Sequence, residues 1–152
     1  MKLSGQDNKS FELWVVNYQY RDNKTDEYDS NWLTIGIKLK GFKREWITSD
    51  PSLLTWELKS LADWLQNILT GDTEEKEIEF IEPNLKFELI DNADDTFTVR
   101  THLTLESKPS WYTEDETFSF DLIVDRGQLK HSIERLKNEL INFPGRAGVK
   151  LN

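Results

Sequence analysis

Residues 50–65 read Asp-Pro-Ser-Leu-Leu-Thr-Trp-Glu-Leu-Lys-Ser-Leu-Ala-Asp-Trp-Leu, and this stretch predicts a strand that runs into an amphipathic helix. Its apolar residues recur at the i, i+4, i+7 and i+8 spacing of a helix that lays one face on a core. Asp50 can act as the N-cap with Pro51 at the first helical position, and Thr55 is an alternative start. Gly71 supplies the usual stop, so we expect the helix to end near residue 70.

The segments on both sides of this helix have the composition and the alternation of strands. Strands are expected at residues 11–20, 32–40, 43–48, 78–81, 85–89, 97–105 and 118–124. A second helix should begin after Asp125, because Asp125 and Gln128 have the spacing of a capping box. Its apolar stripe runs to Leu140, and Phe143-Pro-Gly should end it.

The element order is therefore βββ-α-ββββ-α. Strands that come in hairpin-linked runs, without alternating one-for-one with helices, indicate an α+β fold with antiparallel pairing. We expect an antiparallel sheet of about six to seven strands, covered by the two amphipathic helices. At 152 residues the chain should form a single domain over residues 1–152, with residues 146–152 as a frayed tail.

The chain is acidic, with 28 Asp and Glu against 19 Lys and Arg and a net charge of −9. Residues 72–95 alone hold ten acids and two lysines. Such a protein should repel nucleic acid and anionic membranes, and it should attract a basic partner. The alternative is that the charge only keeps the domain soluble.

Several functional classes find no support in the composition. The chain has no cysteine, which excludes disulfides and thiolate metal sites. The first residues lack the apolar region of a signal peptide, and no apolar run approaches the roughly 20 residues of a membrane span, so we expect a cytoplasmic, soluble protein.

The amino-acid sequence also contains no recognisable catalytic or metal-binding motif. The seven glycines form no phosphate-binding loop, and His102 and His131 are both expected to be ordinary surface residues. The acids of residues 22–29 lack the glycine and the terminal glutamate of a calcium loop. We therefore predict a protein that is not an enzyme and that needs neither a cofactor nor a metal.

Five of the six tryptophans allow two interpretations. Trp56 and Trp64 are eight residues apart, close to two helical turns, so they should lie near the same face of the first helix. They either fill the seam between the helix and the sheet or anchor a partner, because Trp and Tyr are frequent at binding hot spots. The same two readings apply to Trp32, Trp46 and Trp111 with its neighbour Tyr112.

Three segments carry a resemblance to a known family: residues 12–20, residues 28–33 and residues 50–58 with the following Leu61 and Trp64-Leu65. Together they resemble the pattern of the WapI-type immunity proteins over nearly the whole chain, most closely up to Leu69. The resemblance implies a small cytosolic protein that binds and neutralises a secreted or contact-delivered toxin, typically a nuclease that acts on tRNA. It brings no catalytic residues to this chain.

Our predicted partner is thus a toxin domain with a basic surface, with no nucleic acid and no membrane. The candidate partner-binding residues are the exposed acids and two aromatic residues of the expected loops, namely Asp22, Asp26, Glu27, Asp29, Asp94, Asp95, Trp111 and Tyr112. The alternative is a structural or assembly domain without a toxin partner, which forms a homo-oligomer such as a homodimer through a free sheet edge or an aromatic patch.

Overall fold

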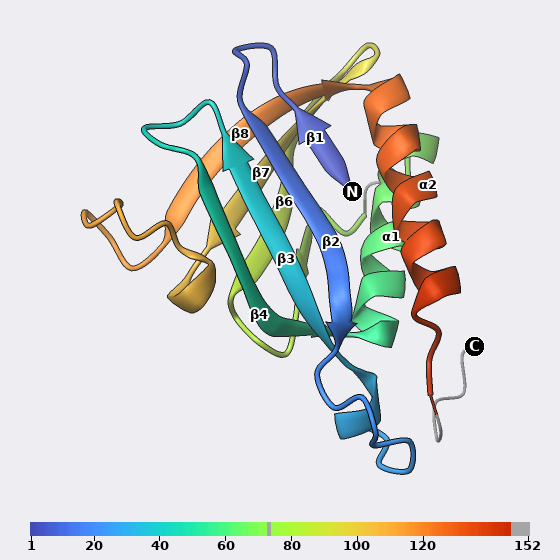
Figure 1. The fold of residues 1–152 in the computed structure, drawn as a ribbon. Helices are drawn as coiled ribbons and strands as arrows, with labels where there is room; N and C mark the ends of the chain where they lie inside the picture. The colour runs from blue at the N-terminus through green and yellow to red at the C-terminus, as the bar shows by residue number, and fades with distance from the viewer. Residues whose placement is uncertain (73, 147–152) are drawn as a thin grey trace.

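The computed structural model describes residues 1–72 and 74–146, and these form eight strands, two α-helices and two short 3-10 helices (Figure 1). The first half contains β1 (Lys2–Ser4), β2 (Ser10–Tyr18), η1 (Asp29–Asn31), β3 (Trp32–Lys40), β4 (Trp46–Leu54) and α1 (Thr55–Thr70). The second half contains β5 (Glu77–Glu79), β6 (Leu85–Ala93), β7 (Thr96–Leu103), η2 (Leu105–Ser107), β8 (Phe118–Asp125) and α2 (Arg126–Asn142). The chain is therefore built from two successive ββββα halves.

Each half forms its own four-stranded antiparallel sheet, in the order β1-β2-β3-β4 and β5-β6-β7-β8. The predicted α+β class and the antiparallel pairing are confirmed, but the single sheet of six to seven strands was wrong. Two physical reasons explain the difference. First, the three residues of β1 are too few to show the alternation of a strand. Second, the alternation of a strand shows which of its faces is buried, but it does not show to which sheet the strand belongs.

The two sheets face each other, and the core lies between them. Phe11 of β2 meets Phe87 of β6 with ring centroids 5.7 Å apart, and it meets Phe120 of β8 at 6.2 Å. The helices lie side by side, run in opposite directions and cover one open side of this core (Figure 1). Leu58 and Leu65 of α1 are fully buried there. The apolar stripe predicted for the first helix is thus the face that closes the core.

Helix α1 begins at Thr55, so the alternative start is confirmed and the start at Asp50-Pro51 was wrong. Strand β4 continues through these residues because it pairs with β3 as far as Leu54. Pro51 is tolerated there because β4 is an edge strand with a register shift opposite β3. The cap comes instead from Glu57, whose Oε2 accepts the backbone N–H of Leu54 at 2.9 Å.

Helix α2 follows its predicted boundaries. The carboxylate of Asp125 accepts the backbone N–H of Gln128 at 2.8 Å, which confirms the N-cap. The return half of the predicted capping box was wrong, because the side chain of Gln128 accepts the backbone N–H of Ser4 at 2.9 Å. The helix ends at Asn142, before Pro144, as expected. Of the predicted frayed tail, residues 147–152 lie outside the described residues.

Candidate partner-binding surface

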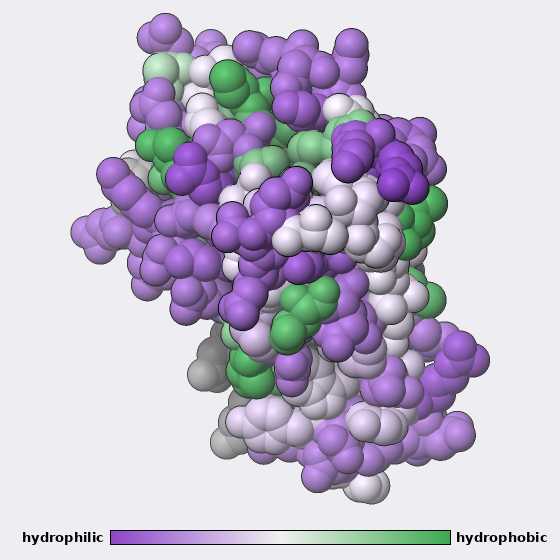
Figure 2. Space-filling view, turned by 90° about the vertical axis from the view of Figure 1, so that its left-hand side faces the viewer, coloured by the Kyte–Doolittle hydropathy of each residue, from purple (hydrophilic) through white to green (hydrophobic). Residues whose placement is uncertain are grey.

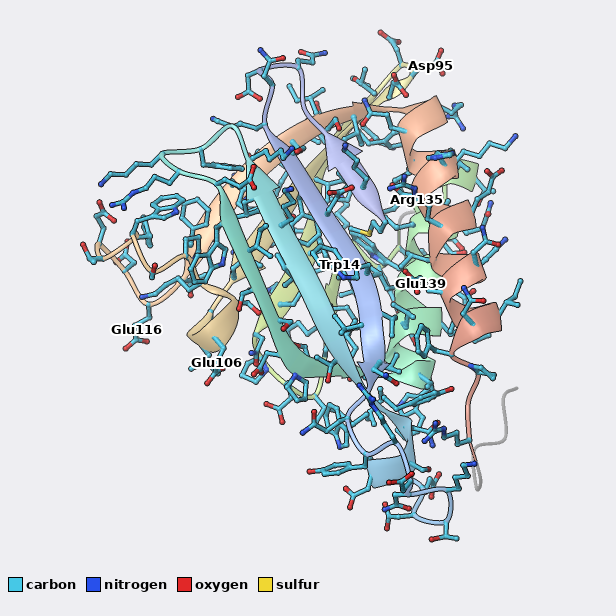
Figure 3. The ribbon with its side chains drawn as sticks, viewed as in Figure 1. Trp14, Asp95, Glu106, Glu116, Arg135 and Glu139 are labelled. Atoms are coloured by element: carbon cyan, nitrogen blue, oxygen red, sulfur yellow. The ribbon has the colours of Figure 1, made fainter. Side chains whose placement is uncertain are left out.

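The predicted partner-binding residues lie in three separate parts of the surface. The loop of residues 19–31, between β2 and β3, forms the lower end of the molecule in Figure 1. The turn between β6 and β7 lies at the top, where Figure 3 labels Asp95. The loop of residues 104–117 lies at the side, where Figure 3 labels Glu106 and Glu116. The fold does not bring these groups together, so each is a separate candidate.

The two acids of the β6–β7 turn differ: Asp94 shapes the turn through its backbone, and the side chain of Asp95 is engaged within the protein. Asp94 adopts a left-handed backbone conformation with φ of 54°, which a tight hairpin turn requires. The carboxylate of Asp95 accepts Nε–H of Arg126 at 3.3 Å, and Nη1 of Arg126 donates to the carbonyl of Leu69 at 2.8 Å. Arg126 thereby ties this turn to the end of α1.

Trp111 and Tyr112 hold the 104–117 loop against the core. Their rings lie 5.2 Å and 4.9 Å from the ring of Phe118, and both are half-buried. The indole N–H of Trp111 is buried and has no hydrogen-bond partner among the described residues. Much of the aromatic surface of this pair therefore packs inward, which favours the structural interpretation of both residues.

The 19–31 loop is organised by one of its own acids. Asp26 accepts the backbone N–H groups of Tyr28 at 2.9 Å and Asp29 at 2.8 Å through Oδ1, and its carbonyl accepts the N–H of Ser30 at 3.1 Å. Asp26 therefore shapes the turn that leads into η1. The other predicted acids of the loop, Asp22, Glu27 and Asp29, are exposed.

The base of this loop is fixed by Thr55 at the start of α1 and by Arg146, which follows α2. The side-chain oxygen of Asn31 accepts the hydroxyl of Thr55 and the backbone N–H of Arg146, each at 2.8 Å. The guanidinium of Arg146 donates to the carbonyls of Tyr20, Arg21 and Asn23 at 3.0–3.3 Å. It also lies 3.4 Å from the ring centroid of Tyr18. A loop with so many acids is thus held in a defined shape.

The two tryptophans of α1 differ in their roles. Trp64 is buried, and its indole N–H donates to the carbonyl of Glu75 at 2.9 Å, so it fills the seam as one interpretation predicted. Trp56 remains partly exposed, and the exposed Tyr28 of the loop meets its ring edge-on at 5.4 Å. Trp56 and Tyr28 therefore belong to the same surface as the loop acids.

Two further aromatic residues lie at the base of the loop: Trp32, for which the sequence left both interpretations open, and Tyr20, which sequence reasoning missed. Tyr20 and Trp32 line a cavity of about 220 Å³ together with Gln19, Pro51 and Glu82. We call the acids and aromatic residues of this end of the molecule the end surface, which consists of Asp22, Glu27, Asp29, Glu82, Tyr20, Tyr28, Trp32 and Trp56. In Figure 2 the lower end of the molecule combines hydrophilic side chains with pale ones of intermediate hydropathy, a class that includes Trp and Tyr.

A larger cavity of about 470 Å³ lies between β2 and α2, where Figure 3 labels Trp14, Arg135 and Glu139. Its charges are balanced, with Glu12 and Glu139 against Lys38 and Arg135. Nη1 of Arg135 already lies 3.8 Å from the carboxylate of Glu12. This cavity therefore shows no charge preference for a partner.

The outer face of the second sheet carries a row of cross-strand polar pairs. His102 of β7 lies between Ser119 of β8, with Nδ1 and Oγ 2.6 Å apart, and Glu88 of β6. Sequence reasoning did not predict that these serine, histidine and glutamate side chains meet. They meet because the antiparallel register places the three residues side by side on the outer face of the sheet. Beside it, Arg100 and Asp121 form the same kind of pair through two hydrogen bonds of 2.7 and 2.9 Å. The regular repetition along the sheet favours a structural role.

Within residues 1–72 and 74–146, no group of three His, Asp or Glu side chains could hold a metal ion, and no helix is long and apolar enough to cross a membrane. A family model described as the immunity protein WapI-like family matches residues 2–144. The chain belongs to this family. The resemblance given by the sequence segments is thus confirmed. No curated protein matches the chain.

Membership of the WapI-like immunity family indicates toxin neutralisation in general, with a toxin protein as the partner. Immunity proteins are generally non-catalytic. For a WapI-like protein the relevant site is therefore a surface that recognises another protein, and the end surface is a place where exposed acids lie beside exposed and half-buried aromatic residues.

Proposed function

We propose that this protein neutralises a nuclease toxin by binding it directly through the end surface. The observation that carries the proposal is that four acids and four aromatic residues gather on and around the 19–31 loop, which Asp26, Asn31 and Arg146 hold in shape. Trp and Tyr are enriched among the few residues that provide most of the binding energy at protein interfaces, while acids steer and select a basic partner. Acids alone would not distinguish this surface from the rest of an acidic protein, and aromatic residues alone would not indicate a basic partner.

The physical role of the acids follows from the substrate of a nuclease. A nuclease groove carries cations that neutralise phosphates. The carboxylates of Asp22, Glu27 and Asp29 can occupy these positions, and the net charge of −9 accelerates the encounter. Because the loop is already ordered by internal hydrogen bonds, binding loses less entropy than it would with a mobile loop.

The test is co-expression with the toxin domain encoded beside this protein's gene, combined with affinity measurements on the purified pair. The wild-type protein should rescue growth. The variant with Asp22→Asn, Glu27→Gln and Asp29→Asn should bind about 10–100-fold more weakly, because it removes three carboxylates that have no role in the loop's own hydrogen bonds.

A matched control carries Asp91→Asn, Asp94→Asn and Glu116→Gln, which change the net charge equally at other exposed positions. Its affinity should stay within about threefold of the wild type. If the control weakens binding and the loop variant does not, the contact surface lies elsewhere. If the wild-type protein neither rescues growth nor binds the toxin, the proposed function is wrong.

A further inference from the structure

The cavity beside the 19–31 loop is assembled from four segments of the chain. Gln19 and Tyr20 follow β2, Trp32 begins β3, and Pro51 lies at the register shift of β4. Glu82 comes from the second half, in the turn that follows β5. Two aromatic side chains thus line the same space as one carboxylate.

Three acids, Glu82 in the lining and Asp50 and Glu106 close by, give this region its negative charge. The described part of the chain places no lysine or arginine within ion-pair distance of Glu82, Asp50 or Glu106. Burial raises the pKa of Asp50, and the neighbouring Glu106 and Glu82 raise it further by repulsion. Nδ2 of the buried Asn84 joins two of these acids, at 3.4 Å from Asp50 and 3.2 Å from Glu106.

We propose that this cavity receives an arginine side chain of the bound toxin, with the guanidinium against Tyr20 and Trp32 and in an ion pair with Glu82. The inference rests on the proposed function, and it adds the chemistry of one contact. A guanidinium stacks on aromatic faces and pairs with a carboxylate, and it is less strongly hydrated than an ammonium group. Arginine therefore matches all three lining side chains better than lysine does.

The size of the cavity agrees with a single side chain. At about 220 Å³ it is smaller than the roughly 300–1,000 Å³ of pockets that hold drug-sized ligands. A bound metal ion is disfavoured, because the described residues include no group of three His, Asp or Glu that could hold one. A protruding cationic side chain fits both the charge and the size of this cavity.

The first experiment tests the cavity without any toxin. The capped peptide Gly-Arg-Gly is titrated into the ¹⁵N-labelled protein while the indole N–H signal of Trp32 is followed. The signal should shift with a dissociation constant on the order of 10 mM, which one cation–π contact and one ion pair can supply. A matched peptide with citrulline, which is nearly isosteric and uncharged, should give no saturable shift.

The isosteric Glu82→Gln substitution should abolish the shift caused by the arginine peptide, and Tyr20→Leu should weaken it while keeping apolar volume. The Glu116→Gln variant removes an exposed acid elsewhere and should behave as the wild type. Equal responses to the arginine and citrulline peptides would overturn the assignment of the cavity, whatever the toxin does.

The second experiment uses the complex with the toxin domain. Glu82→Gln should weaken affinity about 10–100-fold. In a scan of the toxin's arginines, one Arg→Ala substitution should lose most of its effect when combined with Glu82→Gln, because both remove the same contact. Tight binding that Glu82→Gln leaves unchanged would overturn the arginine contact and leave the proposed function standing. Absence of any binding would instead contradict the proposed function.

Discussion

At the residue scale, Gly36 is a position where an added side chain would collide with a neighbouring ring. It lies on the outer face of β3, and the indole of Trp14 covers it so closely that an added Cβ would lie 2.2 Å from the ring. We expect Gly36→Ala to destabilise the protein by about 1–3 kcal/mol, because the indole must move away. Urea unfolding measures the loss.

The cause can be isolated with a double-mutant cycle. In a Trp14→Val background the ring is absent, so Gly36→Ala should cost much less there than in the wild type. An equal cost in both backgrounds would show that the loss has another origin than the contact between Gly36 and Trp14.

The buried carboxylate of Glu57 accepts hydrogen bonds from two segments of the chain. Besides the Leu54 N–H, it accepts the N–H of Ile81 at 2.7 Å through Oε1, and it thereby joins the start of α1 to the second half. Glu57→Ala leaves two backbone N–H groups without their acceptor. We expect a loss of about 2–4 kcal/mol in the free energy of unfolding, measured by urea titration at pH 7.

The same residue should make stability depend on pH. Burial is the main cause that raises the pKa of Glu57 above its ordinary value of 4.5. The folded state therefore takes up this proton before the unfolded state does, so the contribution of Glu57 to stability grows as pH falls through the raised pKa toward 4.5. The difference between wild type and Glu57→Ala should increase from pH 7 to about pH 4.5, and a constant difference would contradict the assigned shift.

At the element scale, the 19–31 loop depends on a residue more than a hundred positions away. Arg146→Ala removes the donors to three loop carbonyls and the contact with Tyr18. Amide hydrogen exchange in residues 19–31 should accelerate roughly tenfold or more, while the core strands keep their protection. Arg135→Ala, on the exposed face of α2, is the matched control and should leave the loop unchanged.

The elements also show what a single sequence can and cannot predict. The alternation of residues 32–40 gave β3 with its observed bounds, and the apolar stripe gave the buried face of α1. The helix start predicted at Asp50-Pro51 was wrong, because the pairing of these residues with β3 keeps them in a strand despite their strong local preference for a helix start. The cavity of the end surface could not be foreseen, because Tyr20, Trp32 and Glu82 come from separate segments and no local period relates them.

At the scale of the whole molecule, the dominant property is the uncompensated negative charge. With a net charge of −9, association with a basic toxin should be electrostatically steered. We expect the association rate constant to fall at least tenfold between about 0.02 M and 0.5 M salt, since the Debye length shortens, while the dissociation rate changes little. Stopped-flow mixing at several salt concentrations measures both, and a flat association rate would contradict the steering role of the acids.

The two ββββα halves have a consequence for how the chain can be divided. All strand pairing stays within a half, yet each sheet turns its apolar face toward the other half. A chain cut between α1 and β5 would therefore yield two fragments with complete hydrogen-bonded sheets and bare inner faces. Each fragment would be the natural binding partner of the other, so that this protein could be reassembled from two polypeptides whose interface is the former core.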